Sequence, residues 1–143
     1  MRRVRTGSQF EEAAAYSRAV EHDGWIFVSG TMGIDSQTGQ LPETFTAQAR
    51  NAFSTIKHVL EQFGAGFSDI VQCRVFIAER AWVPDLVPVL KDLFQGIEPA
   101  NTTVIAQLPR PDAKIEVEVV ACIGAGGTVA GVDTTRTRLG TGP

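Results

Sequence analysis

The chain has 143 residues, of which 43% are hydrophobic and 20% charged, a balance that suits one globular domain with a sizeable core. Its formal net charge of -3 argues against a surface that collects phosphates, so we expect no nucleic-acid partner. No apolar run approaches the roughly 20 residues that span a bilayer, and no apolar leader follows the charged start. We therefore expect a cytoplasmic protein without a membrane partner.

The chain has two cysteines, Cys73 and Cys122, and both lie inside apolar stretches. No Cys-x-x-Cys or His-rich spacing typical of a metal site is present. We expect reduced core thiols and no bound metal.

The first half of the chain predicts a hairpin and then a helix. Residues 16–20 and 25–28 are expected to pair around the turn His22-Asp23-Gly24. From Thr44 onward, apolar residues recur at helical spacing as far as Phe63, and Gly64 follows. This pattern predicts a long amphipathic helix whose opposite face, with His58, is in water.

The second half predicts a strand at 70–78, a helix from about 84 to 95, and strands at 102–106 and 115–123. Pro88 lies beyond the first turn of that helix and removes a backbone hydrogen bond, so we expect a late start or a bend. The strand that follows Pro99 is interpreted as a core strand. The order β-β-α-β-α-β-β predicts an α+β fold, with one mixed sheet and both helices on one face.

The last twenty residues, 124–143, are rich in Gly and Thr and poor in large apolar residues. We expect them to form a mobile C-terminal extension after a domain of residues 1–123.

The last predicted strand alternates strictly. Its odd positions, from Ile115 to Ile123, are apolar and must face the helices, whereas its even positions are Glu116, Glu118, Val120 and Cys122. A fully solvated face would not need the last two of these. Another subunit is the natural cover for this second face, so we expect an obligate oligomer.

A carboxylate at the boundary of such an interface is partly desolvated, which raises its pKa and suits it to proton transfer near neutral pH. The alternative is that Glu116 and Glu118 simply pair with Lys or Arg at the subunit boundary.

Short motifs along residues 10–123 together resemble the RidA (YjgF) family of reactive-intermediate deaminases. They are Tyr16-Ser17-x-Ala19-Val20, Phe27-Val28-Ser29-Gly30, Gln48-Ala49-x-Asn51, Gly64-x-x-x-x-Ser68-Asp69-Ile70-Val71, Val75-Phe76-Ile77, Pro99-Ala100, Leu108-Pro109 and Ile115-Glu116-Val117-Glu118.

The resemblance implies a chorismate-mutase-like fold with a mixed six-stranded sheet, assembled as a homotrimer around a central barrel, with ligand clefts between subunits. It also implies hydrolysis of small 2-imino or enamine acids to the 2-keto acid and ammonia, without metal or cofactor. Carried over to this sequence, Glu118 would hold and activate the water, and Gly30 would be a backbone donor. Tyr16 would lie in the cleft, and Ser29 and Thr103 would line the pocket.

Asn101 stands where the deaminating branch of the family has the arginine that grips the substrate carboxylate. Losing such a bidentate anchor typically costs about 2 to 5 kcal/mol. We therefore expect an arginine-lacking branch, a hydrolase that acts on an imine, enamine or related labile C–N compound other than simple 2-imino acids. Three arginines could replace the missing cation: Arg18, Arg74 and Arg110.

A second hypothesis is a non-catalytic trimer whose cleft binds a small metabolite or serves a regulatory role. A third, RNA cleavage, is disfavoured by the acidic balance of the chain.

Overall fold

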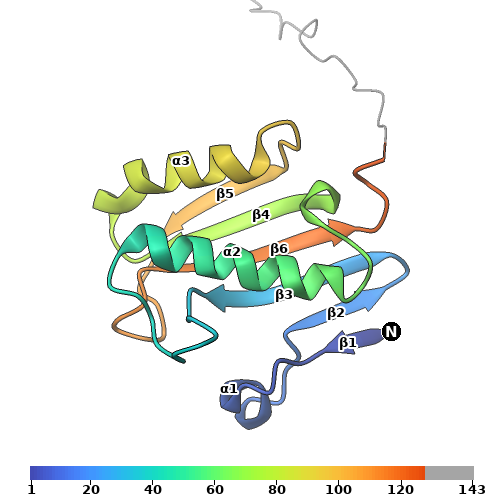
Figure 1. Ribbon diagram of the computed structural model, residues 1–143, viewed down its shortest axis with the longest axis horizontal. Helices are drawn as coiled ribbons and strands as arrows, with labels where there is room; N and C mark the ends of the chain where they lie inside the picture. Colours follow the sequence, from blue (N-terminus) through green and yellow to red (C-terminus); the bar gives the residue numbers. More distant parts are fainter. Residues whose placement is uncertain (128–143) are drawn as a thin grey trace, which may run out of the picture.

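The computed structural model describes residues 1–127, and its chain order alternates strands and helices (Figure 1). The strands and α-helices are β1 (Arg2–Val4), α1 (Gln9–Ala13), β2 (Ala19–His22), β3 (Trp25–Met32), α2 (Phe45–Glu61), β4 (Ile70–Ile77), α3 (Val83–Phe94), β5 (Ala100–Ile105) and β6 (Ile115–Cys122).

The strands form one mixed sheet in the order β1-β2-β3-β6-β4-β5. All neighbours are antiparallel except β4 and β5, which run parallel. Helices α2 and α3 lie side by side on one face of the sheet (Figure 1). The predicted α+β architecture is confirmed, but the residue patterns missed β1, the sixth strand, and the short helix α1.

Helix α2 forms where the apolar spacing predicts it. The Thr44 side chain accepts a hydrogen bond from the backbone N–H of Ala47 and so caps the first turn. Gly64, just beyond the helix, adopts a φ of 77°, which a glycine accepts without strain. His58 lies on the exposed face, as expected.

Helix α3 starts at Val83, with Pro84 in its first turn, and continues through Pro88. The expected late start is therefore wrong. The missing N–H of Pro88 costs one hydrogen bond, but Leu86 and Val89 are 2% and 1% exposed, and their burial in the hydrophobic core holds the helix in place.

Strand β5 differs from its interpretation as a core strand. All six of its residues are exposed, including Val104 and Ile105. The strand lies at the edge of the sheet, where it pairs with β4 alone, and neither α2 nor α3 packs closely over its side chains. A β-branched run of this kind reads as core in a sequence whether it is covered by its own helices or left open.

Strand β6 lies inside the sheet and follows the predicted alternation. Ile115, Val117, Val119 and Ala121 are buried under the helices, and the intervening residues are half-buried on the open face.

The segment after β6 is tied to the domain at its start. The Asp69 carboxylate accepts hydrogen bonds from the backbone N–H groups of Gly66, Gly124 and Gly126 at 2.9, 3.0 and 3.2 Å. Residues 124–127 of the expected extension are thus anchored, and its remaining residues, 128–143, lie outside the described part of the chain.

Asp69→Ala should lower the free energy of unfolding by about 2 kcal/mol, because three backbone donors lose a buried acceptor. Urea denaturation at fixed protein concentration measures this change. Asp35→Ala is the control, since the Asp35 carboxylate accepts its two bonds, from Gln37 and Thr38, in an exposed turn. An equal loss in both variants would contradict the anchoring role.

Candidate active site

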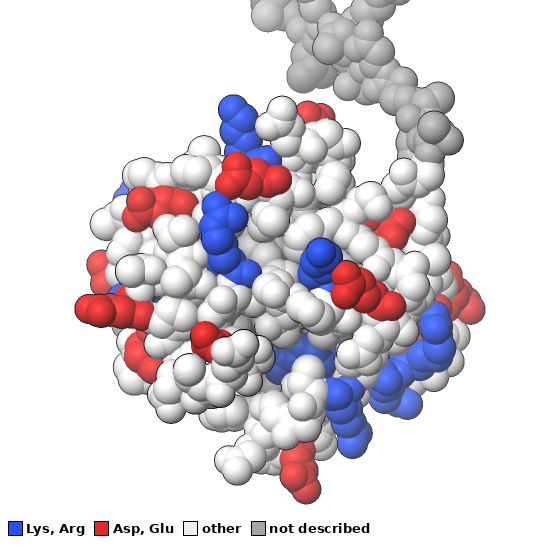
Figure 2. Space-filling model, viewed as in Figure 1, with Lys and Arg blue, Asp and Glu red and all other residues white. Residues whose placement is uncertain are grey.

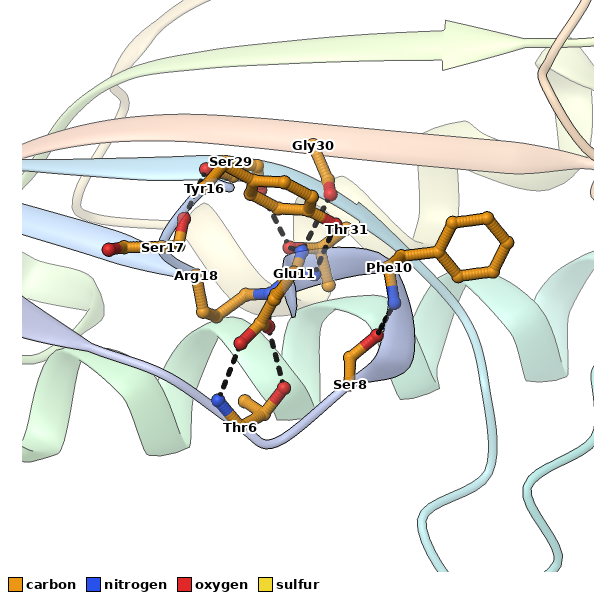
Figure 3. Close-up of polar contacts among 10 residues, drawn as sticks. All are labelled: Thr6, Ser8, Phe10, Glu11, Tyr16, Ser17, Arg18, Ser29, Gly30 and Thr31. Atoms are coloured by element: carbon orange, nitrogen blue, oxygen red, sulfur yellow. Dashed lines mark hydrogen bonds and ion pairs between the residues drawn. The ribbon is translucent and has the colours of Figure 1, made fainter. Parts of the chain in front are cut away.

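The guanidinium of Arg18 lies at the centre of a polar cluster between α1, β2 and β3 (Figure 3). Arg18 is 9% exposed. Its Nη1 donates to the carbonyl oxygen of Gly30 at 2.7 Å and to Oγ1 of Thr31 at 3.2 Å, and its Nη2 donates to the hydroxyl of Tyr16 at 3.2 Å. One buried arginine therefore connects two residues that the family resemblance predicts in the cleft.

Glu11, on α1, holds this arginine from the other side. Ser8 caps the helix, and the Glu11 carboxylate accepts hydrogen bonds from Nε of Arg18 at 3.0 Å and from the backbone N–H and hydroxyl of Thr6. Burial by itself would raise the pKa of Glu11, but the bonds from Thr6 and Arg18 outweigh it and lower the pKa. Glu11 is thus a charged, fully bonded anchor for Arg18.

A β-bulge places Gly30 next to this cluster. The register of β3 with β6 shifts between Val28 and Thr31, so Ser29 and Gly30 together face one residue, Glu118. The absence of a side chain at Gly30 leaves room for the carboxyl of Glu116, since a Cβ at this position would collide with Oε1 of Glu116. The bulge and the glycine together bring the Glu116 carboxyl beside the Arg18 cluster.

The surroundings of Glu116 favour its protonated form. Its neighbours across the sheet are Met32 on β3 and Phe76 on β4, both apolar. Burial raises the pKa of the Glu116 carboxyl, the charge of Arg18 partly opposes that shift, and the charge of Glu118 adds to it. A half-buried carboxyl without a salt bridge to any residue in 1–127 is suited to proton transfer.

Glu118 is placed differently. Its neighbour on β4 is Arg74, whose Nη1 donates to Oε1 of Glu118 at 2.9 Å. Within the protomer, Glu118 is therefore paired with an arginine, as the alternative expects of both glutamates, whereas Glu116 has no ion-pair partner in residues 1–127. Its role as the water-activating residue stays a prediction, and the contacts favour Glu116 for that role.

The other predicted residues fall into two groups. Tyr16, Ser29 and Gly30 lie together, and the Ser29 hydroxyl donates to the carbonyl oxygen of Ser17 at 2.8 Å (Figure 3). Asn101 and Thr103 are both on β5, where the Thr103 hydroxyl donates to Oδ1 of Asn101 at 3.2 Å. Three strand spacings, about 14 Å, separate β5 from β3. One protomer does not bring the two groups together.

Cys73 is not a competing nucleophile. Cys73 is buried in the core, as expected, and burial raises the pKa of its thiol to about 12, so it stays a thiol at neutral pH. Cys122 is half-buried rather than in the core, at the end of β6.

Gly30→Ala should displace the Glu116 carboxyl while leaving the fold intact, because the added methyl meets only the flexible end of that side chain. We expect catalytic efficiency to fall at least tenfold and the urea midpoint to change little. The control is Gly66→Ala, in the loop before β4, where the backbone is extended with a φ of -147° and an added Cβ meets no atom within 4 Å. Full activity in Gly30→Ala would contradict the placement of Glu116.

The residue patterns did not single out Arg18, Glu11 or the apolar setting of Glu116. Arg18 was one of three arginines that they could not rank. Glu116 and Glu118 differ in the residues that lie opposite them on β3 and β4. These neighbours depend on the pairing register of the strands, which no local sequence pattern predicts.

Comparisons with known proteins show to which family the chain belongs. Residues 6–123 match the family model described as Endoribonuclease L-PSP, to which the RidA and YjgF proteins belong. A RutC family protein of Aquifex aeolicus is 33% identical over 124 residues, which cover 85% of this chain and 98% of that protein. A 2-iminobutanoate/2-iminopropanoate deaminase of Dermatophagoides farinae is 34% identical over 110 residues, covering 76% and 85%.

Solved structures show the same fold. Rv2704 of Mycobacterium tuberculosis, described as a member of the YjgF/YER057c/UK114 family, superposes with a TM-score of 0.78 at 30% identity and covers 85% of this chain and 98% of its own. TdcF of E. coli with bound serine has a TM-score of 0.70 at 28% identity, covering 75% and 87%. The chain belongs to the Endoribonuclease L-PSP (YjgF/RidA) family.

Two further findings concern residues 1–127. None of their helices is both long and apolar enough to cross a membrane. They contain no group of three or more His, Cys, Asp or Glu side chains that could hold a metal ion.

Proposed function

We propose that this protein is a hydrolase that acts on an imine, an enamine or a related labile C–N metabolite by activating water at Glu116. The observation that supports the proposal is the half-buried Glu116 carboxyl, which lies against Gly30 and next to the Arg18–Tyr16 cluster. The deaminase activity that the name of the Dermatophagoides relative states is consistent with this class of reaction.

The chemistry needs one carboxyl group that works twice. As the oxygen of water attacks the carbon of the C=N bond, the Glu116 carboxylate takes a proton from the water. The resulting carbinolamine then collapses to a carbonyl product. The carboxyl returns its first proton to the nitrogen as the carbinolamine forms. As the C–N bond then breaks, the same group takes the hydroxyl proton of the carbinolamine and passes it to the leaving nitrogen, which departs as ammonia or an amine. No net proton or electron is gained or lost by the enzyme.

We infer that the complete site forms between subunits of a homotrimer with a central barrel. Two features support this inference: the predicted residues are split between β3 and β5, and the open face of the sheet exposes large apolar side chains. Among them are Phe27 on β3, 53% exposed, and Val104 on β5. In such a trimer, Asn101 and Thr103 of one subunit would face Tyr16, Gly30 and Glu116 of the next. Light scattering should give three times the protomer mass of 15.4 kDa.

The charged groups of the site support a substrate without a free α-carboxylate, and thus an arginine-lacking branch. Arg18 is the candidate cation whose charge acts on Glu116, but its bonds to Glu11, Tyr16, Gly30 and Thr31 leave at most one of its five N–H groups for a ligand. Arg74 is paired with Glu118, and Arg110 is paired with Asp112 at 2.6 Å. Each of these three arginines is thus already paired with a carboxylate of residues 1–127, so none of them offers an uncompensated positive charge to a substrate carboxylate.

Asn101→Arg should raise catalytic efficiency on 2-imino acids at least tenfold, because a guanidinium restores a charge-assisted bond to the carboxylate. Imines generated in the assay from amino acids and from neutral amines would be compared for both proteins. The control is Thr102→Arg, which adds the same charge on the neighbouring residue of the edge strand. An equal gain in both variants, or on neutral imines as well, would contradict the role of position 101.

A non-catalytic binding protein is the second candidate, and the serine bound to the related TdcF favours it. It predicts a saturable small ligand and no imine consumed faster than in buffer. RNA cleavage, which the family name states, has less support, since basic and acidic side chains are interspersed over the helix-covered face and the basic ones gather only towards the β1 edge (Figure 2).

A further inference from the structure

Arg18 carries a buried positive charge to which the hydrolysis proposed above gives no role. Four of its N–H groups are bonded within the protein. Of the four acceptors, only the Tyr16 hydroxyl has a proton that makes no hydrogen bond within residues 1–127. The other partners, the Glu11 carboxylate, the Gly30 carbonyl and the Thr31 hydroxyl, belong to α1 and β3. They fix the guanidinium in one orientation (Figure 3).

The direction of the Arg18–Tyr16 bond determines what Tyr16 can do. A guanidinium has only donors, so the hydroxyl oxygen of Tyr16 must accept, and its own O–H is left to donate elsewhere. Within residues 1–127, no hydrogen bond uses that proton. The guanidinium carbon also lies 5.6 Å from the centre of the Tyr16 ring, a second contact that restrains the side chain.

We propose that Arg18 is a positioning residue that, anchored by Glu11, directs the Tyr16 hydroxyl to donate its proton to the substrate beside Gly30 and Glu116. This inference rests on the proposed function and narrows the substrate class. A phenol donates one hydrogen bond but brings no positive charge, and the three candidate arginines are already paired with carboxylates. We therefore infer a substrate with a carbonyl, amide or hydroxyl oxygen next to its C–N bond, where 2-imino acids carry a carboxylate.

Arg18 has a second, electrostatic effect on the reaction. Two charged groups act on Glu116: Arg18, from the segment before β2, and Glu118, from its own strand. The residues opposite Glu116 on β3 and β4 are uncharged. Loss of the arginine charge should therefore move the acidic limb of the pH–rate profile to higher pH, a change that a merely structural arginine would not cause.

Tyr16 is the single tyrosine of the chain, which allows a test that does not depend on turnover. In protein labelled with ¹³C at the tyrosine ζ carbon, the one resonance should shift in Arg18→Lys, because a lysine cannot keep both the Glu11 and the Tyr16 bonds. The same resonance should stay in place in Arg74→Gln, which removes an arginine from the open face. An unchanged resonance in Arg18→Lys would overturn the proposal. If Arg18→Lys does not fold, Glu11→Gln/Arg18→Gln removes both buried charges together and gives the same readout.

Kinetics then tests the link to substrate. We expect Tyr16→Phe and Arg18→Lys each to lower kcat/KM about tenfold, and the double variant to lose little more, because both remove the same bond. A loss of about a hundredfold in the double variant would overturn the proposal. Absence of turnover in the wild-type protein would instead refute the proposed function, and the tyrosine resonance would still decide whether Arg18 positions Tyr16.

Discussion

Glu116→Gln should lower kcat/KM on the true substrate by about 10²- to 10⁴-fold, the range that proton transfer by a positioned side chain contributes. The amide has nearly the shape of the carboxyl and fits the same space beside Gly30, but it cannot take a proton from water. Glu118→Gln is the matched control on the same face of the same strand, and it should keep most of the activity because Glu118 is paired with Arg74. A larger loss of activity in Glu118→Gln than in Glu116→Gln would instead assign the activation of water to Glu118.

The Glu116→Gln variant should not be less stable than the wild-type protein. Because burial raises the pKa of the Glu116 carboxyl above its ordinary value of 4.5, the folded protein binds that proton more tightly than the unfolded chain. The stabilisation of the folded protein by this bound proton is therefore fully present below about pH 4.5 and is lost as the pH rises through the pKa of Glu116 in the folded protein. At pH 7 Glu116→Gln should be at least as stable as the wild-type protein, so a loss of activity cannot be attributed to unfolding.

Glu11→Ala should lower the free energy of unfolding by about 3 to 5 kcal/mol, the largest effect that we expect on stability. The substitution leaves the guanidinium of Arg18 buried without its counter-ion and removes the acceptor for both donors of Thr6. Denaturant unfolding at pH 7 and fixed protein concentration measures the loss. Glu61→Ala is the control, since its exposed pair with Lys57 on α2 should leave the midpoint unchanged.

The effect of Glu11 depends on pH in the opposite sense to that of Glu116. The pKa of Glu11 is lowered in the folded protein, so its stabilisation is present above its ordinary value of 4.5 and is lost as the pH falls through the folded pKa. The difference between wild type and Glu11→Ala should therefore shrink on acidification. A difference in the free energy of unfolding that stays constant down to pH 3 would mean that the Glu11–Arg18 ion pair does not contribute to stability.

The sequence predicted most of the fold because its periodic segments agree with the final architecture. The spacing in α2 and the alternation in β6 each locate a buried face without knowledge of the partner. The strand β1 was missed because three residues, two of them arginines, carry no period. The interpretation of β5 failed because local patterns do not say whether a strand lies at the edge of a sheet.

The site was predicted less completely for a related reason. Alternation placed Glu116 and Glu118 on one face, but the choice between them depends on what lies opposite each, and Arg74 is far from both in sequence. Arg18 lies next to a motif residue, yet its importance comes from Glu11 in a helix that no pattern predicted. Local patterns therefore identify candidate residues, whereas contacts between residues far apart in the sequence determine what each candidate can do chemically.

The pH dependence of kcat/KM in the wild-type protein, measured beside an NMR titration of the Glu116 carboxyl, tests most directly whether this group receives the proton from water. We predict that both curves have the same inflection, above pH 4.5, and that the rate falls tenfold per pH unit on the acidic side. A rate that stays constant while Glu116 takes up its proton would contradict the account.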